Sequence, residues 1–66
     1  MTAQQRRDAI LDILNQASGP VSAAALAGRF GVSRQLIVGD VALLRAGGAA
    51  IDATARGYVI QRSREG

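Results

Sequence analysis

The sequence predicts a small α+β domain, mainly α-helical, in which three helices precede one β-hairpin. Apolar residues recur at helical spacing in three successive segments of the 66-residue chain. After the pair Gly47-Gly48, this spacing changes to the two-residue alternation that is typical of strands. A glycine, Gly31, separates the second helical segment from the third. These three observations predict the order of the elements.

The first helix is expected over residues 4–17, where apolar side chains follow helical spacing at Ile10, Ile13, Leu14 and Ala17. Thr2 is the expected N-cap, because its hydroxyl can accept a hydrogen bond from a free N–H of the first turn. Ser18-Gly19-Pro20 ends the helix. Pro20-Val21 is expected to form a short strand, since proline is tolerated at a strand's start.

The second helix is expected over residues 23–30, with Ser22 as its N-cap. Its alanines favour a helix and also let a neighbouring helix approach closely. Gly31 follows as the turn residue, because a tight turn between two helices needs a residue that tolerates positive φ.

The third helix, residues 33–46, is the one that the others support. Ser33 is its expected N-cap, and an apolar stripe faces the core at Ile37, Val41 and Leu44. Gly47-Gly48 gives the helix a stop that tolerates positive φ. The opposite face is slim and carries its polar groups at the N-terminal end, with Gln35, Val38, Gly39 and Ala42. This is how a helix that reads DNA bases is built, because its first turn meets the base edges.

The hairpin is expected over residues 51–61, where Ile51, Ala53, Tyr58 and Ile60 alternate with their neighbours around the loop Ala55-Arg56-Gly57. Helix, short strand, helix, turn, helix and hairpin is the order of a winged helix-turn-helix with a two- to three-stranded antiparallel wing sheet. A helix-turn-helix without a wing is the nearest rival, and a hairpin directly after the third helix favours the winged form. The domain would span residues 1–61, followed by a polar tail at 62–66 that is expected to fray.

The amino-acid composition favours a binding function over a catalytic one. The chain has no His and no Cys, so the usual general base and thiol nucleophile are absent, and no enzyme activity, cofactor or metal is expected. Asp8 and Asp12, at i and i+4, are interpreted as a solvated face rather than a metal site. A net charge of +3 with a pI of 11.2 suits a polyanionic partner, although ordinary surface charge also explains it. No apolar run is long enough to cross a membrane, and a cytoplasmic location is expected.

Six residues are candidate DNA contacts: Ser33, Arg34, Gln35, Val38, Arg56 and Gly57. Arg34 can bind a guanine edge or a phosphate, and Gln35 can pair with adenine. Ser33 can form a hydrogen bond to a phosphate in addition to its bond as the N-cap. Val38 is expected to contact either a thymine methyl group or a neighbouring side chain. Arg56, beside Gly57 at the wing tip, suits a minor groove or a phosphate. Each also has an ordinary reading as a cap or a solvated surface residue.

The other charged side chains are interpreted as structural. Arg6, Arg7 and Arg29 are expected to be plain surface rather than flanking phosphate contacts. Arg45 suits the negative end of the third helix and is expected to pair with an acid such as Asp12. Asp40 would repel phosphate, so it is expected to anchor an arginine or the wing backbone.

The run V-S-R-Q-L-I-V-G-D-V-A-L-L-R-A-G with I-D-A-T-A-R-G-Y-V-I resembles the DNA-binding half of the niacin-responsive transcriptional repressors. More broadly it is similar to the winged helices of the biotin-repressor and deoxyribonucleoside-repressor classes. The resemblance covers about residues 6–60. Family members carry a further C-terminal domain with histidines that binds nicotinate, and this chain has no His. The resemblance therefore implies DNA binding without a small-molecule effector on this chain alone, either because the sequence is part of a longer regulator or because the signal enters elsewhere.

Gly39 departs from the family pattern, where a polar or charged residue is usual, and it offers no side chain to read a base. The expected function is sequence-specific binding of double-stranded DNA as a transcriptional regulator, a repressor by resemblance. A homodimer on a palindromic site is expected, because one module of this size buries too little surface for tight specific binding. The alternative is a winged helix that docks or dimerises with proteins and does not bind DNA.

Overall fold

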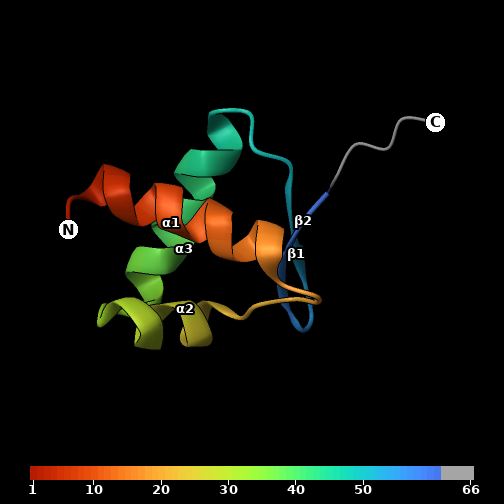
Figure 1. The fold of residues 1–66 in the computed structure, drawn as a ribbon, viewed down its shortest axis with the longest axis horizontal. Coiled ribbons are helices and arrows are strands. Elements are labelled where there is room, and N and C mark those ends of the chain that lie inside the picture. Colours follow the sequence, from red (N-terminus) through yellow and green to blue (C-terminus); the bar gives the residue numbers. More distant parts are fainter. Residues whose placement is uncertain (62–66) are drawn as a thin grey trace.

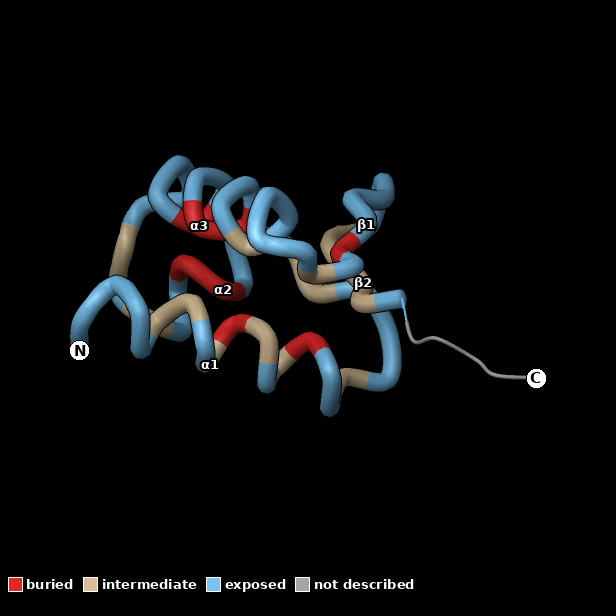
Figure 2. The backbone as a smooth tube through the Cα atoms, turned by 90° about the horizontal axis from the view of Figure 1, so that it is seen from above, coloured by how far each residue is buried: buried red, intermediate tan, exposed pale blue. Residues whose placement is uncertain are grey.

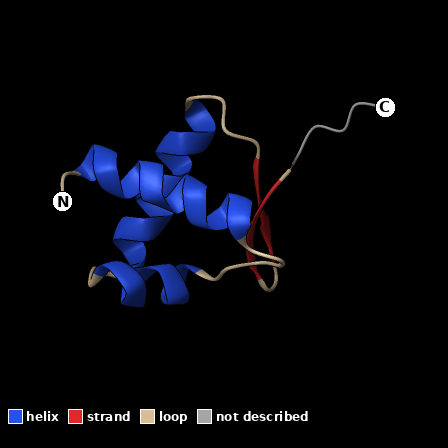
Figure 3. Cartoon of the chain, viewed as in Figure 1, coloured by secondary structure: helices blue, strands red, loops and turns tan. Residues whose placement is uncertain are grey.

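The computed structural model describes residues 1–61, and the predicted tail at 62–66 lies outside the described residues. Three helices, α1 (Ala3–Gln16), α2 (Ala23–Phe30) and α3 (Arg34–Ala46), precede a hairpin of β1 (Ile51–Thr54) and β2 (Gly57–Ile60). Figures 1 and 3 show the helices crossing one another and the hairpin standing beside them. The predicted winged helix-turn-helix is confirmed. No helix in residues 1–61 has both the length and the apolar character needed to span a membrane.

All three predicted N-caps are present. The hydroxyls of Thr2, Ser22 and Ser33 accept hydrogen bonds from backbone N–H groups in the first turns of α1, α2 and α3, at 3.1, 3.0 and 3.1 Å. The side chain of Gln5 also accepts from the backbone N–H of Thr2 at 2.9 Å, which completes a capping box. Because Thr2 caps at residue 2, α1 begins at Ala3 rather than at residue 4. It ends one residue earlier than predicted, since Ala17 is already extended.

The turn glycine between α2 and α3 behaves as predicted. Gly31 has φ of 67°, and the backbone N–H of Val32 bonds to the carbonyl of Ala27 at 3.0 Å. The predicted stop at Gly47-Gly48 is present at the end of α3: Gly47 has φ of −84° and is the C-cap, and Gly48 has φ of 105°. The positive φ therefore falls on the second glycine of the pair.

The core is aliphatic and lies between the three helices and the start of β1. Its buried side chains come from α1 (Ile10, Leu14), α2 (Leu26, Ala27), α3 (Ile37, Val41) and β1 (Ile51). Figure 2 shows α3 along one side of the molecule and α1 along the other, with the buried positions facing inward. Ile37 and Val41 confirm the predicted inward stripe of α3, while the third member, Leu44, is half-buried and packs against the core.

The hairpin is antiparallel, with a register running from Ile51 opposite Ile60 to Thr54 opposite Gly57. The connecting turn is therefore only Ala55-Arg56, and Gly57 belongs to β2 rather than to the loop. The predicted strand at Pro20-Val21 is reduced to Val21, which makes an isolated antiparallel bridge to Tyr58. The two backbones exchange hydrogen bonds of 3.0 and 2.8 Å. This bridge joins the segment before α2 to the wing.

Candidate nucleic-acid interface

The exposed face of α3 lies where the sequence predicts it. Gln35, Val38, Gly39 and Ala42 are all exposed, and Val38 keeps 47% of its surface accessible. Ser33 is exposed as well, and its hydroxyl is engaged as the N-cap. Val38 and Leu43, which is 58% accessible, therefore both leave apolar surface of α3 exposed to water.

An open hollow of about 310 Å³ lies between the start of α2, the first turns of α3 and the end of the wing. Arg34 and Val38 line it from α3, and Arg56 and Gly57 line it from the hairpin. In Figure 2 the exposed end of the hairpin lies on the same side of the molecule as α3. The two arginines that are 22 positions apart in sequence therefore border one solvent-accessible surface.

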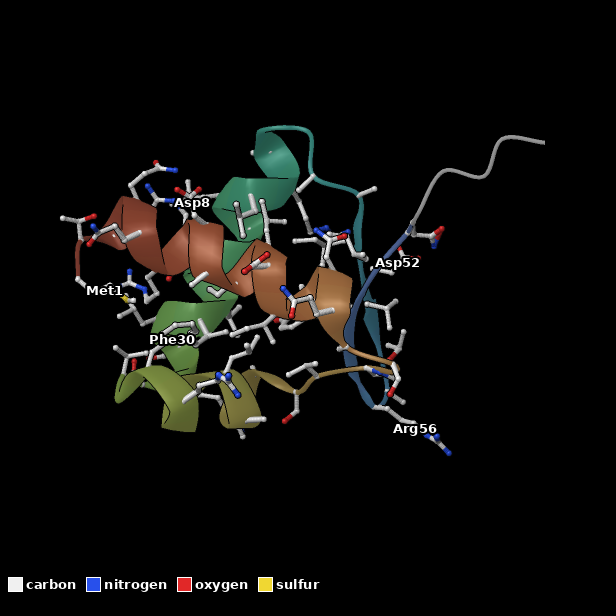
Figure 4. The ribbon with its side chains drawn as sticks, in the orientation of Figure 1. Met1, Asp8, Phe30, Asp52 and Arg56 are labelled. Carbon is white, nitrogen blue, oxygen red and sulfur yellow. The ribbon has the colours of Figure 1, made fainter. Side chains whose placement is uncertain are left out.

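The backbone at the wing tip is held by one side chain. The hydroxyl of Thr54 donates to the carbonyl oxygen of Gly57 at 2.7 Å and accepts from the backbone N–H groups of Arg56 and Gly57 at 3.2 Å. Figure 4 shows the side chain of Arg56 extending outward beyond the end of the hairpin. Its main chain is thus fixed, while its guanidinium group remains exposed to solvent.

Four of the six predicted contact residues line the hollow, and two do not. Arg34, Val38, Arg56 and Gly57 line it, whereas Ser33 and Gln35 lie beside it on the exposed start of α3. The sequence prediction missed the opposite wall, which is the start of α2 at Ser22, Ala23 and Ala24. One feature of the sequence could have predicted this wall. The short strand expected before Ser22 needs a partner strand, and the wing is the available one.

Asp40 is buried and ion-paired, in spite of its place on α3. Its carboxylate accepts two hydrogen bonds from the guanidinium group of Arg6 on α1, one to Nε and one of 3.1 Å to Nη2, and lies 3.6 Å from Nη1 of Arg7. The hydrogen bond from Arg6 holds the pKa of the Asp40 carboxyl below its ordinary value, against the opposing effect of burial. The same bond raises the pKa of Arg6.

This ion pair corrects one prediction and supports another. Arg6 and Arg7 are not plain surface, because their side chains are only 13% and 23% exposed and both face Asp40. Asp40 does anchor an arginine, and it therefore presents no charge to a bound polyanion. The pair also connects α1 directly to the helix that carries the candidate interface.

The predicted pair of Arg45 with Asp12 is wrong within residues 1–61. The two ion pairs in that part of the chain both end on Asp40. Asp12 instead accepts a hydrogen bond of 3.4 Å from the side chain of Gln16, which lies four positions further along the same helix. Arg29 is exposed, as predicted, and lies outside the lining of the hollow.

Two known proteins are similar to this chain over most of its length. The probable transcription repressor NiaR of Thermotoga maritima is 48% identical over 63 residues, which are 96% of this chain and 36% of that protein. The transcription repressor NadR of Bacillus subtilis is 44% identical over 54 residues, which are 82% of this chain and 30% of that protein. The chain thus spans about a third of the length of each relative.

These relatives confirm the predicted resemblance to the niacin-responsive repressors, since both are named as transcription repressors. A family model described as an HTH domain matches residues 6–59, which include all three helices apart from the first turn of α1 and nearly all of the hairpin. The chain therefore belongs to the HTH domain family, and the hairpin after α3 makes it a winged helix-turn-helix.

Proposed function

We propose that the chain binds double-stranded DNA in a sequence-specific manner, as the operator-binding part of a transcription repressor. The observation that carries this proposal is the shared hollow, where Arg34 and Val38 of α3 meet Arg56 of the wing on one accessible surface. The names of the two relatives support the regulatory role. The action is binding rather than catalysis, and its place is the cytoplasm.

In this proposal the first turn of α3 enters the major groove. Arg34 donates to a guanine edge or to a phosphate, and Gln35 pairs with an adenine. Ser33, at the helix start, lies next to the phosphate backbone. The wing then lies on the adjacent backbone or minor groove, with Arg56 making the contact and Gly57 next to it at the start of β2. The anchoring of Asp40 by Arg6 removes the one acid on α3 from the path of the phosphates.

Two copies of the chain are proposed to act together on a palindromic site, because a single module of this kind buries only about 600–1,000 Å² of interface. Selection of bound duplexes from a random pool should return an inverted repeat whose half-site centres lie about 10 base pairs apart, or a multiple of that distance. Sedimentation of the complex should find two chains on one duplex. A selected motif without symmetry would contradict the homodimer.

A salt titration tests the DNA interface itself. The logarithm of the binding constant should fall linearly with the logarithm of salt concentration, with a slope near −0.9 for each phosphate neutralised. Arg34→Ala and Arg56→Ala should each weaken binding and make that slope shallower by about 1 where the arginine contacts a phosphate. Fluorescence anisotropy with a labelled duplex measures both quantities.

Arg29→Ala is the matched control for charge. It removes the same charge from an exposed arginine that does not line the hollow, so the slope should change less than with either interface variant. Binding that is absent even at low salt, or that does not depend on salt, would refute the proposal and favour a winged helix that docks proteins.

A further inference from the structure

Beyond its first turn, the exposed residues of α3 are apolar except for Arg45, which lies beside Val38 around the helix. At about 100° per residue, an arc of about 140° runs from Val38 to Leu43. Six exposed residues share that arc: Gln35, Val38, Gly39, Ala42, Leu43 and Ala46. Gln35 is the polar member, while Val38 and Leu43 are 47% and 58% accessible. This face therefore offers few hydrogen bonds to base edges and a large amount of uncovered apolar surface.

Gly39 lies within this arc, and nothing in the fold requires a glycine there. Among residues 1–61, no atom lies within 4 Å of the position that a Cβ atom at residue 39 would take, and the φ of Gly39 is not positive. A glycine in the interior of a helix weakens the helix relative to alanine. The gain that offsets this cost is therefore to be sought in something outside the chain that approaches the backbone of α3.

We infer that the middle of α3 packs against thymine 5-methyl groups in the major groove, with Gly39 as the point of closest approach. The inference rests on the proposed DNA-binding function. Among the base edges in the major groove, thymine presents a methyl group, and apolar side chains are its usual contacts. Over any other edge, the same side chains would cover polar groups without satisfying their hydrogen bonds.

The charges around the apolar arc favour DNA over a protein as its binding partner. Arg34 and Arg56 border the hollow next to Val38, so the apolar arc is flanked by cations on the side of the wing. Asp40, the acid on the same helix, is covered by Arg6 and Arg7. A polyanion with methyl groups on its inner edge complements this pattern, whereas an apolar protein surface would leave the arginines without partners.

Removal of single methyl groups tests the contact directly. In a duplex recovered by selection from a random pool, thymines under α3 are replaced one at a time by uracil, which lacks only the 5-methyl group. Each replacement at a contacted thymine should weaken binding about four-fold, the factor expected for one apolar carbon taken out of a buried contact. In the Val38→Ala chain, the penalty at the thymine next to residue 38 should shrink. Uracil in place of thymines outside the footprint is the DNA control and should have no effect.

Uracil duplexes that all bind as tightly as the thymine duplex would overturn the inference and leave DNA binding intact. If selection recovers no bound duplex at any salt concentration, the proposed function itself fails. The two failures are therefore distinguishable in one set of measurements.

Gly39→Ala gives a second test, in which stability and affinity should change in opposite directions. Gly28→Ala is its matched control, because Gly28 lies inside α2 and a Cβ there also meets no atom of the described part of the chain within 4 Å. Both substitutions should raise the midpoint of thermal unfolding by about 4 °C, since alanine replaces glycine within a helix. Gly39→Ala alone should weaken binding of the selected duplex, about ten-fold, as expected where an added methyl overfills a close contact.

Equal DNA affinity for the two alanine variants would overturn the role of Gly39. Sedimentation of the chains without DNA supplies the remaining comparison. If Gly39→Ala alone changes the oligomeric state, the face is an interface between two copies of the chain, and the inference is wrong.

Discussion

Replacement of Gly57 by alanine is expected to lower the free energy of unfolding by about 2–4 kcal/mol, from backbone strain and from a contact that cannot relax. Gly57 has φ of 140°, which L side chains rarely adopt. A Cβ atom there would lie 2.5 Å from the carbonyl carbon of Val21 and 2.7 Å from the backbone N of Ser22. Both neighbours are backbone, so the clash can be relieved only by separating the wing from the segment before α2.

A chain of 66 residues has only about 3–5 kcal/mol of stability from a single core, so this loss would unfold a large part of the population. Urea denaturation followed by circular dichroism measures the change. Gly19→Ala is the control, because Gly19 is an exposed loop glycine without a positive φ and without atoms near its Cβ position. Equal unfolding midpoints for the two variants would contradict the close approach at Gly57.

Asp40→Asn is expected to produce the second large effect, a fall of about 10 °C in the midpoint of thermal unfolding at pH 7. The substitution leaves Arg6 and Arg7 facing a neutral group in a mostly covered site. The loss should be smaller than for a fully buried ion pair, because 13% of the Arg6 side chain and 23% of the Arg7 side chain remain accessible to water.

The pH dependence of stability distinguishes the charge of Asp40 from its shape. Its pKa in the folded chain is lowered, chiefly by the hydrogen bond from Arg6, below the value of about 3.9 that it has when unfolded. Its contribution is therefore complete above that unfolded value and is lost as pH falls through the folded value. The native chain should lose stability on acidification below about pH 4, and Asp40→Asn should flatten this decline.

Asp12→Asn is the control for the acid limb, since Asp12 is exposed and accepts a hydrogen bond of 3.4 Å from Gln16. It should leave both the thermal midpoint and the acid limb close to those of the native chain. An Asp40→Asn profile that parallels the native one from neutral to acidic pH would contradict the role assigned to the ion pair.

Local signals in the sequence were sufficient to predict the helices. Thr2, Ser22 and Ser33 cap their helices because a capping hydroxyl acts within three residues of its own position. Gly31 takes a left-handed conformation for an equally local reason. The period of the apolar residues likewise predicts which side of α3 is buried, as Ile37 shows.

Contacts between distant parts of the chain were not predictable in the same way. Arg6 and Asp40 are separated by 34 positions, and only the crossing of α1 over α3 brings them together. The requirement for glycine at residue 57 likewise depends on the nearby backbone of Val21. The sequence predicted Gly57 as a loop residue and gave no sign of this contact. At the candidate interface, the helical pattern was sufficient to predict that Arg34 and Val38 are exposed on α3. The wall at Ser22–Ala24 depends instead on the bridge between Val21 and Tyr58.

That bridge also gives the molecule an optical probe. Tyr58 is the chain's single tyrosine and there is no tryptophan, so tyrosine emission comes from this one ring. Its backbone is tied to Val21, and the residue lines the hollow. Tyrosine emission therefore monitors the junction of wing and helices, while far-ultraviolet dichroism monitors the helices themselves. A nucleic acid that enters the hollow can be followed through the same ring, without attaching a dye to either partner.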